Sequence, residues 1–197
     1  MVDTRLPIVF VHGFWDKSSV FKSMSRHMKD KGWKVYDSFD IIPNNGMISM
    51  EEMAEQLEGY VNAQLGPEAS FLLLGFSMGG LVSRYYLQNM GGINRVKHLI
   101  TISSPHYGTL MAYTFNRKAC IQMRPNSIFL NSLNSELPIL KKITLTSIWA
   151  KCDTTIVPNN SSHLPIGDEV IFGFGIHPLM PYSSKVIKAV EQAFKNN

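Results

Sequence analysis

Short runs of apolar residues alternate along the chain with longer stretches in which apolar residues recur every three or four positions. The short runs have no polar face, which is typical of strands buried on both sides. The longer stretches have the spacing of helices with one buried face. We predict strands at 7–11, 34–41, 71–74, 96–102, 143–150 and 169–174. We predict helices at 18–31, 49–65, 78–90 and 183–194.

Local signals mark where two of these helices begin or end. Ser49 and Glu52 have the spacing of a capping box, so we expect a helix to start there. Gly32 and Gly66 follow the last apolar positions of two helices and are typical of helix ends. Between 105 and 141 the alternation is lost, and only a short helix near 127–133 is predicted.

Strands that alternate with helices indicate a parallel sheet covered on both faces. We therefore predict an α/β fold, with a doubly wound, mostly parallel sheet of about six strands and helices on both faces. A chain of 197 residues is long enough for one domain with a sizeable core, so we expect a single domain over 1–197.

Composition narrows the choice of partners. The formal charge is only +4, and the basic residues are scattered, which argues against nucleic-acid binding. A charge of this size is compatible with transient contact with a lipid surface. No apolar run is long enough to span a membrane, and no signal peptide is evident, so we expect a cytoplasmic location, with secretion as the alternative. The two cysteines, Cys120 and Cys152, are expected to be free thiols, and a single disulfide between them is the alternative. The oligomeric state is left open.

Ligands of such a sheet bind at the carboxyl ends of its strands. After the third strand the chain reads Gly75-Phe76-Ser77-Met78-Gly79, followed by a helical pattern. A G-x-S-x-G turn between strand and helix is a nucleophile elbow, which holds a serine hydroxyl above the sheet. The alternative is a tight turn with an incidental serine. The position of the turn favours a catalytic role for Ser77.

Three aspartates are candidates for the acid of a catalytic triad. Asp168 precedes the last strand and belongs to the opposite edge of the sheet from Ser77. Asp40 follows the second strand, two positions away across the sheet. Asp153 follows the strand at 143–150, at the correct edge, and we assign the acid to it rather than to a loop-capping role.

Six histidines compete for the role of general base. His177 follows Asp153 in the chain and lies just past the last strand, so we assign the base to it. His106 is the main alternative, because it also follows a strand at the active edge; we expect it to support the site indirectly. The others are expected to brace the first loop (His12), to lie in a helix or strand (His27, His98) or to lie in a loop (His163).

These residues resemble the α/β-hydrolase superfamily, and within it the small bacterial lipases and esterases. The resemblance runs through PIVFVHGF, GFSMGG, ISSPHYGT, CDTTIVP and GFGIHPLM. It implies a minimal α/β-hydrolase fold that cleaves acyl esters, such as triacylglycerols or short-chain esters, through an acyl-enzyme on Ser77. It also implies that the backbone amides of Phe14 and Met78 form the oxyanion hole. The family's base usually follows Gly-x-Gly directly, whereas Ile176 intervenes here.

No metal or organic cofactor is expected for this chemistry, and the substrate is expected to be an acyl ester or a lipid. Acyl transfer or thioester hydrolysis by the same triad is one alternative, and a non-catalytic hydrolase fold that only binds ligands is another. Apolar residues in the loops near the strand ends are expected to line the substrate pocket: Phe14, Trp15, Tyr107, Met111, Tyr113, Ile156, Val157, Leu179 and Met180.

Overall fold

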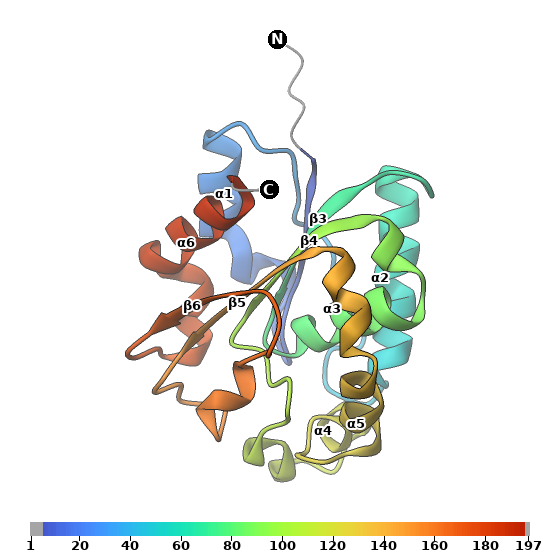
Figure 1. Cartoon of the computed structure of the whole chain (residues 1–197), viewed down its shortest axis with the longest axis vertical. Coiled ribbons are helices and arrows are strands. Elements are labelled where there is room, and N and C mark those ends of the chain that lie inside the picture. The colour runs from blue at the N-terminus through green and yellow to red at the C-terminus, as the bar shows by residue number, and fades with distance from the viewer. Residues whose placement is uncertain (1–5, 196–197) are drawn as a thin grey trace.

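The computed structural model of the chain describes residues 6–195. Its centre is a six-stranded parallel sheet, as predicted, and its strand order is β2-β1-β3-β4-β5-β6 (Figure 1). The strands are β1 (Ile8–Val11), β2 (Val35–Tyr36), β3 (Phe71–Phe76), β4 (Val96–Ile102), β5 (Thr144–Ala150) and β6 (Asp168–Phe172).

Helices cover both faces of the sheet (Figure 1). One face carries α1 (Lys22–Asp30) and α6 (Ser184–Lys195), and the other carries α2 (Met50–Leu65) and α3 (Met78–Asn89). Two further helices, α4 (Lys118–Gln122) and α5 (Ile128–Ser135), lie between β4 and β5 in the chain. Short 3-10 segments occupy Ser18–Phe21, Gly92–Asn94, Leu110–Thr114, Leu137–Lys142, Asn159–Ser162 and His177–Tyr182.

Alternate residues of each inner strand feed two separate cores. In β1, Val9 and Val11 belong to the core shared with α2 and α3. Ile8 and Phe10 belong to the core shared with α1 and α6. Successive side chains of a strand point to opposite faces, so a strand between two helical layers must be apolar throughout. This explains the unbroken apolar runs in the sequence.

The predicted ends of α2 are confirmed. The Ser49 hydroxyl accepts a hydrogen bond from the Glu52 amide at 3.3 Å, and the Glu52 carboxylate accepts one from the Ser49 amide at 2.7 Å. These two bonds satisfy amides that the helix itself leaves unpaired. Gly66 ends the helix with φ +81°, a conformation that glycine adopts without steric cost.

The second strand is much shorter than the predicted 34–41, because only Val35–Tyr36 pairs with β1. β2 is an edge strand, so the chain beyond it has no second neighbour to extend the ladder. Its aspartates instead bind other groups. Asp37 accepts hydrogen bonds from Ser25 and Lys29, and Asp40 accepts one from the Ser18 amide. Phe39 and Ile41 still fill the core, which accounts for the apolar pattern.

The irregular region 105–141 forms short helical turns at the carboxyl end of the sheet (Figure 1). The helix predicted near 127–133 is confirmed as α5, and the Ser127 hydroxyl accepts a hydrogen bond from the Leu130 amide at its start. The sequence did not predict α4 or the 3-10 segments of this region, Leu110–Thr114 and Leu137–Lys142. Each of them buries only one or two side chains and leaves no repeating pattern.

Candidate active site

Ser77 lies between β3 and α3 in a strained turn. Its φ is +53°, a conformation that is rare for residues other than glycine and that marks functional turns. The Ser77 amide donates to the carbonyl of Ile102 at 2.8 Å, which ties the turn to the end of β4. The side chain is 9% exposed. The structure therefore has the strand–serine–helix turn that the sequence pattern predicts.

The glycines around Ser77 are there because nothing larger fits. A Cβ on Gly75 would lie 2.5 Å from the Cα of Gly80, and a Cβ on Gly79 would collide with the carbonyl oxygen of Val11. The elbow is thus packed directly against β1 and against the first turn of α3. Close backbone packing, rather than side-chain contacts, holds the serine in its strained position.

The structure brings Ser77, His177 and Asp153 into one hydrogen-bonded chain. His177 Nε2 lies 2.9 Å from Ser77 Oγ, and His177 Nδ1 lies 3.0 Å from Asp153 Oδ2. Asp153 follows β5 and His177 follows β6, and a bridge between Asp153 and Gly175 holds the two loops together. Both side chains are less than 10% exposed. The imidazole is therefore placed between a hydroxyl and a carboxylate with little access for water.

Asp153 is held in its charged form. Burial alone would raise the pKa of this carboxyl, but hydrogen bonds from His177 and from the amides of Thr155 and Ile156 outweigh burial and lower it. A carboxylate here favours the imidazole tautomer with its proton on Nδ1, which leaves Nε2 free to accept a proton from Ser77. The His177 amide also donates to Thr154 Oγ1 at 3.1 Å, which fixes the loop.

The alternative aspartates lie elsewhere. Asp168 is the first residue of β6, at the opposite edge of the sheet from Ser77. Asp40 accepts a hydrogen bond from the Ser18 amide and lies beyond the edge strand β2. The structure thus brings Asp153 to Ser77 and His177, and it brings neither Asp168 nor Asp40 there.

The other histidines have separate partners. His106 is buried beside Arg84 and Thr101, with 3.1 Å between its Nε2 and Thr101 Oγ1. His98 lies in the core with its Nε2 2.9 Å from Thr146 Oγ1. His27 and His163 pair with Glu191 and Glu169. Among the described histidines, His177 is the one bonded to Ser77.

His12 braces the first loop, as expected. Its Nε2 accepts a hydrogen bond from the Ile41 amide at 3.0 Å, and its Nδ1 lies 3.0 Å from the Gly13 carbonyl oxygen. Asn44 adds hydrogen bonds from its side chain to the carbonyls of Gly13 and Asp16. The loop after β1 is thereby held against the elbow.

Phe14 and Met78 are the predicted oxyanion donors. Within residues 6–195, neither backbone amide donates a hydrogen bond. Phe14 lines the same cavity as Ser77, and Met78 begins α3, whose N-terminus favours negative charge. Two unpaired amides near a reacting serine are what a tetrahedral oxyanion requires. Their role as an oxyanion hole stays a prediction.

Sequence reasoning missed Asp16. A Cβ on Gly13 would lie 3.0 Å from Asp16 Oδ2 and 3.0 Å from Ser77 Cβ, so this carboxyl and Ser77 both lie close to the same side of Gly13. Burial raises the pKa of Asp16, and the imidazoles of His12 and His177 offset part of this effect. Its position three residues after Gly13, in the loop assigned to the oxyanion hole, is the signal that could have drawn attention to it.

An apolar cavity of about 230 Å³ opens beside Ser77. Of the predicted pocket residues, Phe14, Trp15, Met111 and Ile156 line it, while Tyr107, Tyr113, Val157, Leu179 and Met180 do not. A role in substrate binding stays a prediction for all nine residues. The remaining lining residues were not predicted from the sequence, and most of them come from the irregular region: Pro105, Thr109, Ala112, Thr114, Phe115, Cys120, Met123 and Thr155.

Among residues 6–195, no group of three or more His, Cys, Asp or Glu side chains is arranged to hold a metal ion. No helix there has both the length and the apolar character needed to cross a membrane. Cys120 is a buried free thiol and Cys152 an exposed one, as expected.

A model of the palmitoyl protein thioesterase family matches residues 7–134, more than half of the chain. The chain belongs to the palmitoyl protein thioesterase family. The match runs from β1 into α5 and includes Ser77, but it ends before Asp153 and His177. Thioester hydrolysis, which the sequence analysis kept as an alternative, is therefore the activity that gives this family its name.

A curated relative agrees with the family. The chain is 33% identical over 111 residues to a protein from Drosophila melanogaster described as a lysosomal thioesterase PPT2 homolog. The aligned part covers 52% of this chain but only 36% of the fly protein, so the match spans about a third of that relative's length.

Solved structures share the fold at low identity. The mature form of the lipase BlEst2 from Bacillus licheniformis superposes with a TM-score of 0.83 at 16% identity, covering 98% of this chain and 93% of that one. A Listeria innocua gene product gives a TM-score of 0.74 at 15% identity, with 98% and 95% covered. These likenesses show the α/β-hydrolase fold that the sequence motifs predicted.

Proposed function

We propose that this protein is a serine hydrolase that cleaves acyl thioesters, with Ser77 as the nucleophile, His177 as the general base and Asp153 as the residue that orients the base. The observation that carries the proposal is the hydrogen-bonded chain from Ser77 Oγ through His177 to Asp153, beside an apolar cavity. An unbroken relay of this kind argues against a fold retained only for binding.

The reaction proceeds in two halves. His177 takes the Ser77 proton as Oγ attacks the thioester carbonyl, and the amides of Phe14 and Met78 bind the oxyanion. The tetrahedral species collapses, the C–S bond breaks, and His177 protonates the leaving thiolate. Water then attacks the acyl-enzyme with His177 again as the base, which releases the fatty acid and restores Ser77.

The acyl chain is proposed to occupy the 230 Å³ cavity, whose wall is largely apolar. The family favours a thioester as the scissile bond. Oxygen esters are the second candidate, because lipases are among the structural neighbours and the same acyl-enzyme serves both bonds. Acyl transfer differs only in the acceptor of the second half-reaction.

The choice between a thioester and an oxygen ester as the substrate is tested with matched substrates. An acyl thioester and the oxygen ester of the same chain length, each from acetyl to palmitoyl, are compared by kcat/KM. We expect the thioester to be preferred at every length that the enzyme accepts. A consistent preference for the oxygen ester would overturn the assignment in favour of an esterase. Labelling by a fluorophosphonate, which needs an activated serine, tests catalysis itself; no labelling would support a binding module.

The proposal also concerns the domain organisation and the cellular location of the protein. We regard residues 1–197 as acting as one domain, and a cytoplasmic location stays a prediction, since the fly relative is described as lysosomal. Fractionation of the source cells would decide the location.

A further inference from the structure

Residues 103–135, called here the basic segment, have an unusual composition. They include Arg117, Lys118 and Arg124 and contain no aspartate or glutamate. The segment connects β4 to the turns before β5 and includes α4 and α5. A stretch of 33 residues with basic and no acidic side chains is attracted to anionic surfaces.

The same segment exposes large apolar side chains. Ile128, the most exposed, has 90% of its surface accessible. Nearly all exposed large apolar residues of the described chain lie in segments that follow the carboxyl ends of strands, and Ile171 in β6 is the exception. Six of them belong to the basic segment: Tyr107, Leu110, Met111, Tyr113, Ile121 and Ile128. An apolar surface concentrated at one edge marks an interaction site.

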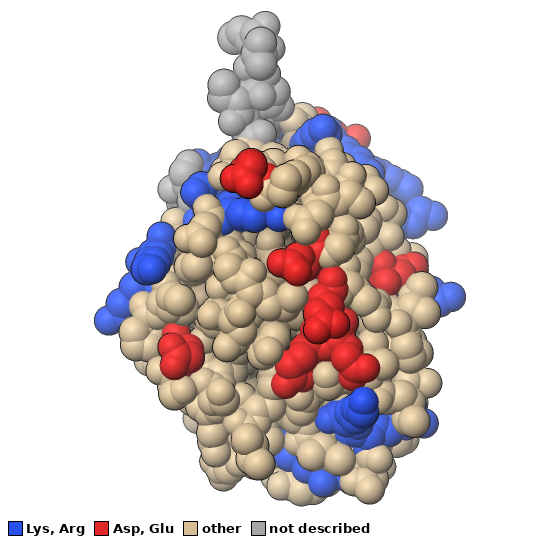
Figure 2. Space-filling model, turned by 90° about the vertical axis from the view of Figure 1, so that its right-hand side faces the viewer, with Lys and Arg blue, Asp and Glu red and all other residues tan. Residues whose placement is uncertain are grey.

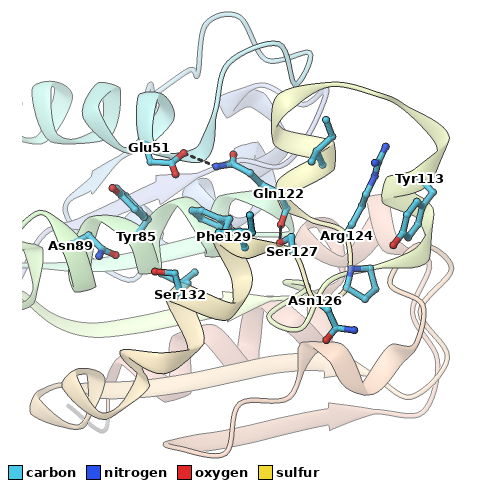
Figure 3. Close-up of a pocket in the computed structure, with 14 residues that line it drawn as sticks. Glu51, Tyr85, Asn89, Tyr113, Gln122, Arg124, Asn126, Ser127, Phe129 and Ser132 are labelled. Carbon is cyan, nitrogen blue, oxygen red and sulfur yellow. Dashed lines mark hydrogen bonds between the residues drawn. The ribbon is translucent and has the colours of Figure 1, made fainter.

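Part of this surface is hollowed into a groove of about 720 Å³ (Figure 3). Tyr113, Ile121, Arg124 and Ile128 line it on the side of the basic segment. The guanidinium of Arg124 lies 4.8 Å from the centre of the Tyr113 ring. Cations beside exposed aromatic and aliphatic side chains are typical of protein surfaces that lie at a membrane interface.

Arg117 is a second cation of the basic segment that lies over aromatic rings, and these rings are nearer to Ser77. Arg117 lies over the rings of Trp15 and Phe115, at 5.7 and 5.5 Å from their centres. Both rings line the cavity beside Ser77, and so do Met111 and Met123. The basic segment is therefore at once the wall of the proposed acyl pocket and the carrier of the apolar surface.

Acidic residues of α2 border the basic segment: Glu51 lines the same groove, and Glu52 pairs with Lys118 at 3.3 Å. Glu51, Glu55 and Glu58 follow one another at helical spacing on α2. Figure 2 shows carboxylates in the middle of the face that carries α2 and basic side chains lower on the same face. Repulsion of these carboxylates would turn α2 away from an anionic surface and the basic side chains towards it.

The basic segment is held firmly in place. Arg84, buried in α3, donates to the carbonyl of Leu133 and to the side chain of Asn134, both at 3.0 Å. Thr109 Oγ1 donates to the carbonyl of Thr155 at 2.9 Å. These bonds fix both ends of the segment to the sheet layer, so the exposed surface is preformed.

We propose that residues 103–135 form a docking surface for an anionic phospholipid membrane, which places the mouth of the acyl cavity against the lipid. Ile121 and Ile128 would enter the region between headgroups and acyl chains, while Lys118 and Arg124 bind lipid phosphates. The use of the cavity for an acyl chain rests on the proposed function. The docking itself does not, and it is tested without catalysis.

The test measures co-sedimentation of the Ser77→Ala protein with vesicles. We expect binding to vesicles of equal parts phosphatidylcholine and phosphatidylglycerol, weaker binding to phosphatidylcholine alone, and loss of binding in high salt. Lys118→Gln combined with Arg124→Gln should weaken binding roughly tenfold or more, since each cation near the surface contributes to attraction. The matched control, Lys22→Gln combined with Lys97→Gln, removes two exposed cations outside the segment and should bind as before.

A second pair of variants tests the apolar side chains of the docking surface. Ile121→Glu should abolish binding, whereas Ile171→Glu should not, although the two side chains are equally exposed at 42% and 43%. Ile128→Ser is a milder variant for use if the charged one folds poorly. All variants, made also with Ser77 intact, should keep the activity of the parent on a soluble acetyl ester, which reports that they are folded.

Two results would overturn the proposal. One is binding that is equal for both lipid compositions or for both members of each matched pair. The other is a dimer of the parent protein in light scattering that Ile121→Glu converts to a monomer, because the surface would then join two copies of the chain. Loss of all hydrolysis with intact vesicle binding would instead remove only the proposed function.

Discussion

The loops that carry Ser77, Asp153 and His177 meet the basic segment at the same cavity, but the two regions are built in opposite ways. Ser77, Asp153 and His177 are less than 10% exposed, and each lies where the chain leaves a strand. In the basic segment, Ile128 and its exposed neighbours lie on short helical turns and face outward. The elbow at Ser77 is held by backbone packing, and the basic segment is held by side-chain hydrogen bonds and by apolar side chains that enter the core.

This difference in construction predicts different effects of substitutions in the two regions. The elbow tolerates no added atom at Gly75 or Gly79, so its geometry is fixed wherever the fold is formed. The basic segment can exchange its exposed side chains without disturbing the sheet, whereas its buried residues belong to the core shared with α2 and α3: Ala112, Ala119, Met123, Phe129, Leu130 and Leu133. We therefore expect changes in the loops to alter all activity, and changes in the segment to alter which acyl groups are accepted.

The largest effect is expected from Ser77→Ala. Without the hydroxyl no acyl-enzyme forms, and kcat should fall roughly 10⁴-fold or more. His177→Ala should be similarly severe, because the members of a triad act as a unit. Steady-state kinetics on a short acyl thioester, with circular dichroism to confirm folding, measures both. If His106→Ala were more damaging than His177→Ala, the base would be misassigned.

Asp153→Asn should cost less than loss of the serine, roughly 10²- to 10⁴-fold in kcat. The amide cannot hold the proton on Nδ1 of His177 as the carboxylate does, so the imidazole loses its preferred tautomer. The matched control is Asp168→Asn, which lies at the opposite edge of the sheet and should be near wild type. Equal losses in the two variants would contradict the role of Asp153.

A third prediction concerns the sheet beneath both regions. Burial lowers the pKa of His98 to about 4 from 6.5. The unfolded chain therefore takes up this proton at a higher pH than the folded one, and stability falls as the pH drops from 6.5 towards 4, by roughly 3 kcal/mol in total.

His98→Gln should remove this part of the acid sensitivity. Urea unfolding at neutral pH and near pH 4.5 gives the free energy of unfolding of both proteins. The free energy of unfolding should change less between the two pH values in the variant than in the parent. Carboxyls whose pKa is lowered, such as Asp153, keep some pH dependence in both proteins. The same pH dependence in both proteins would show that His98 does not control it.

The smallest effect is expected from a change in the wall of the cavity. Met111→Trp should reduce kcat/KM for long acyl chains by roughly ten- to a hundredfold, because a larger side chain shortens the space beside Ser77. Hydrolysis of acetyl thioesters should be nearly unchanged. Met47→Trp, at an exposed methionine that does not line the cavity, is the control. A uniform loss at all chain lengths would argue against an acyl site there.

The amino-acid sequence by itself determined the strand–helix alternation, the elbow at Ser77 and the order of serine, aspartate and histidine along the chain. These features depend on short-range physics: apolar spacing, helix caps, and glycines required by one tight turn. Knowing that parallel strands end at one edge then sufficed to choose Asp153 and His177 over their competitors, and the structure brings them together with Ser77.

Only the tertiary structure decided how the second strand ends, which side chains line the cavity and which residues remain exposed. Asp16 lies beside Ser77 only because the loop after β1 packs against the elbow. Cys120 and Met123 reach the cavity only because α4 folds back beneath it. Such contacts join residues far apart in the chain, and in the irregular region no repeating pattern of apolar positions records them.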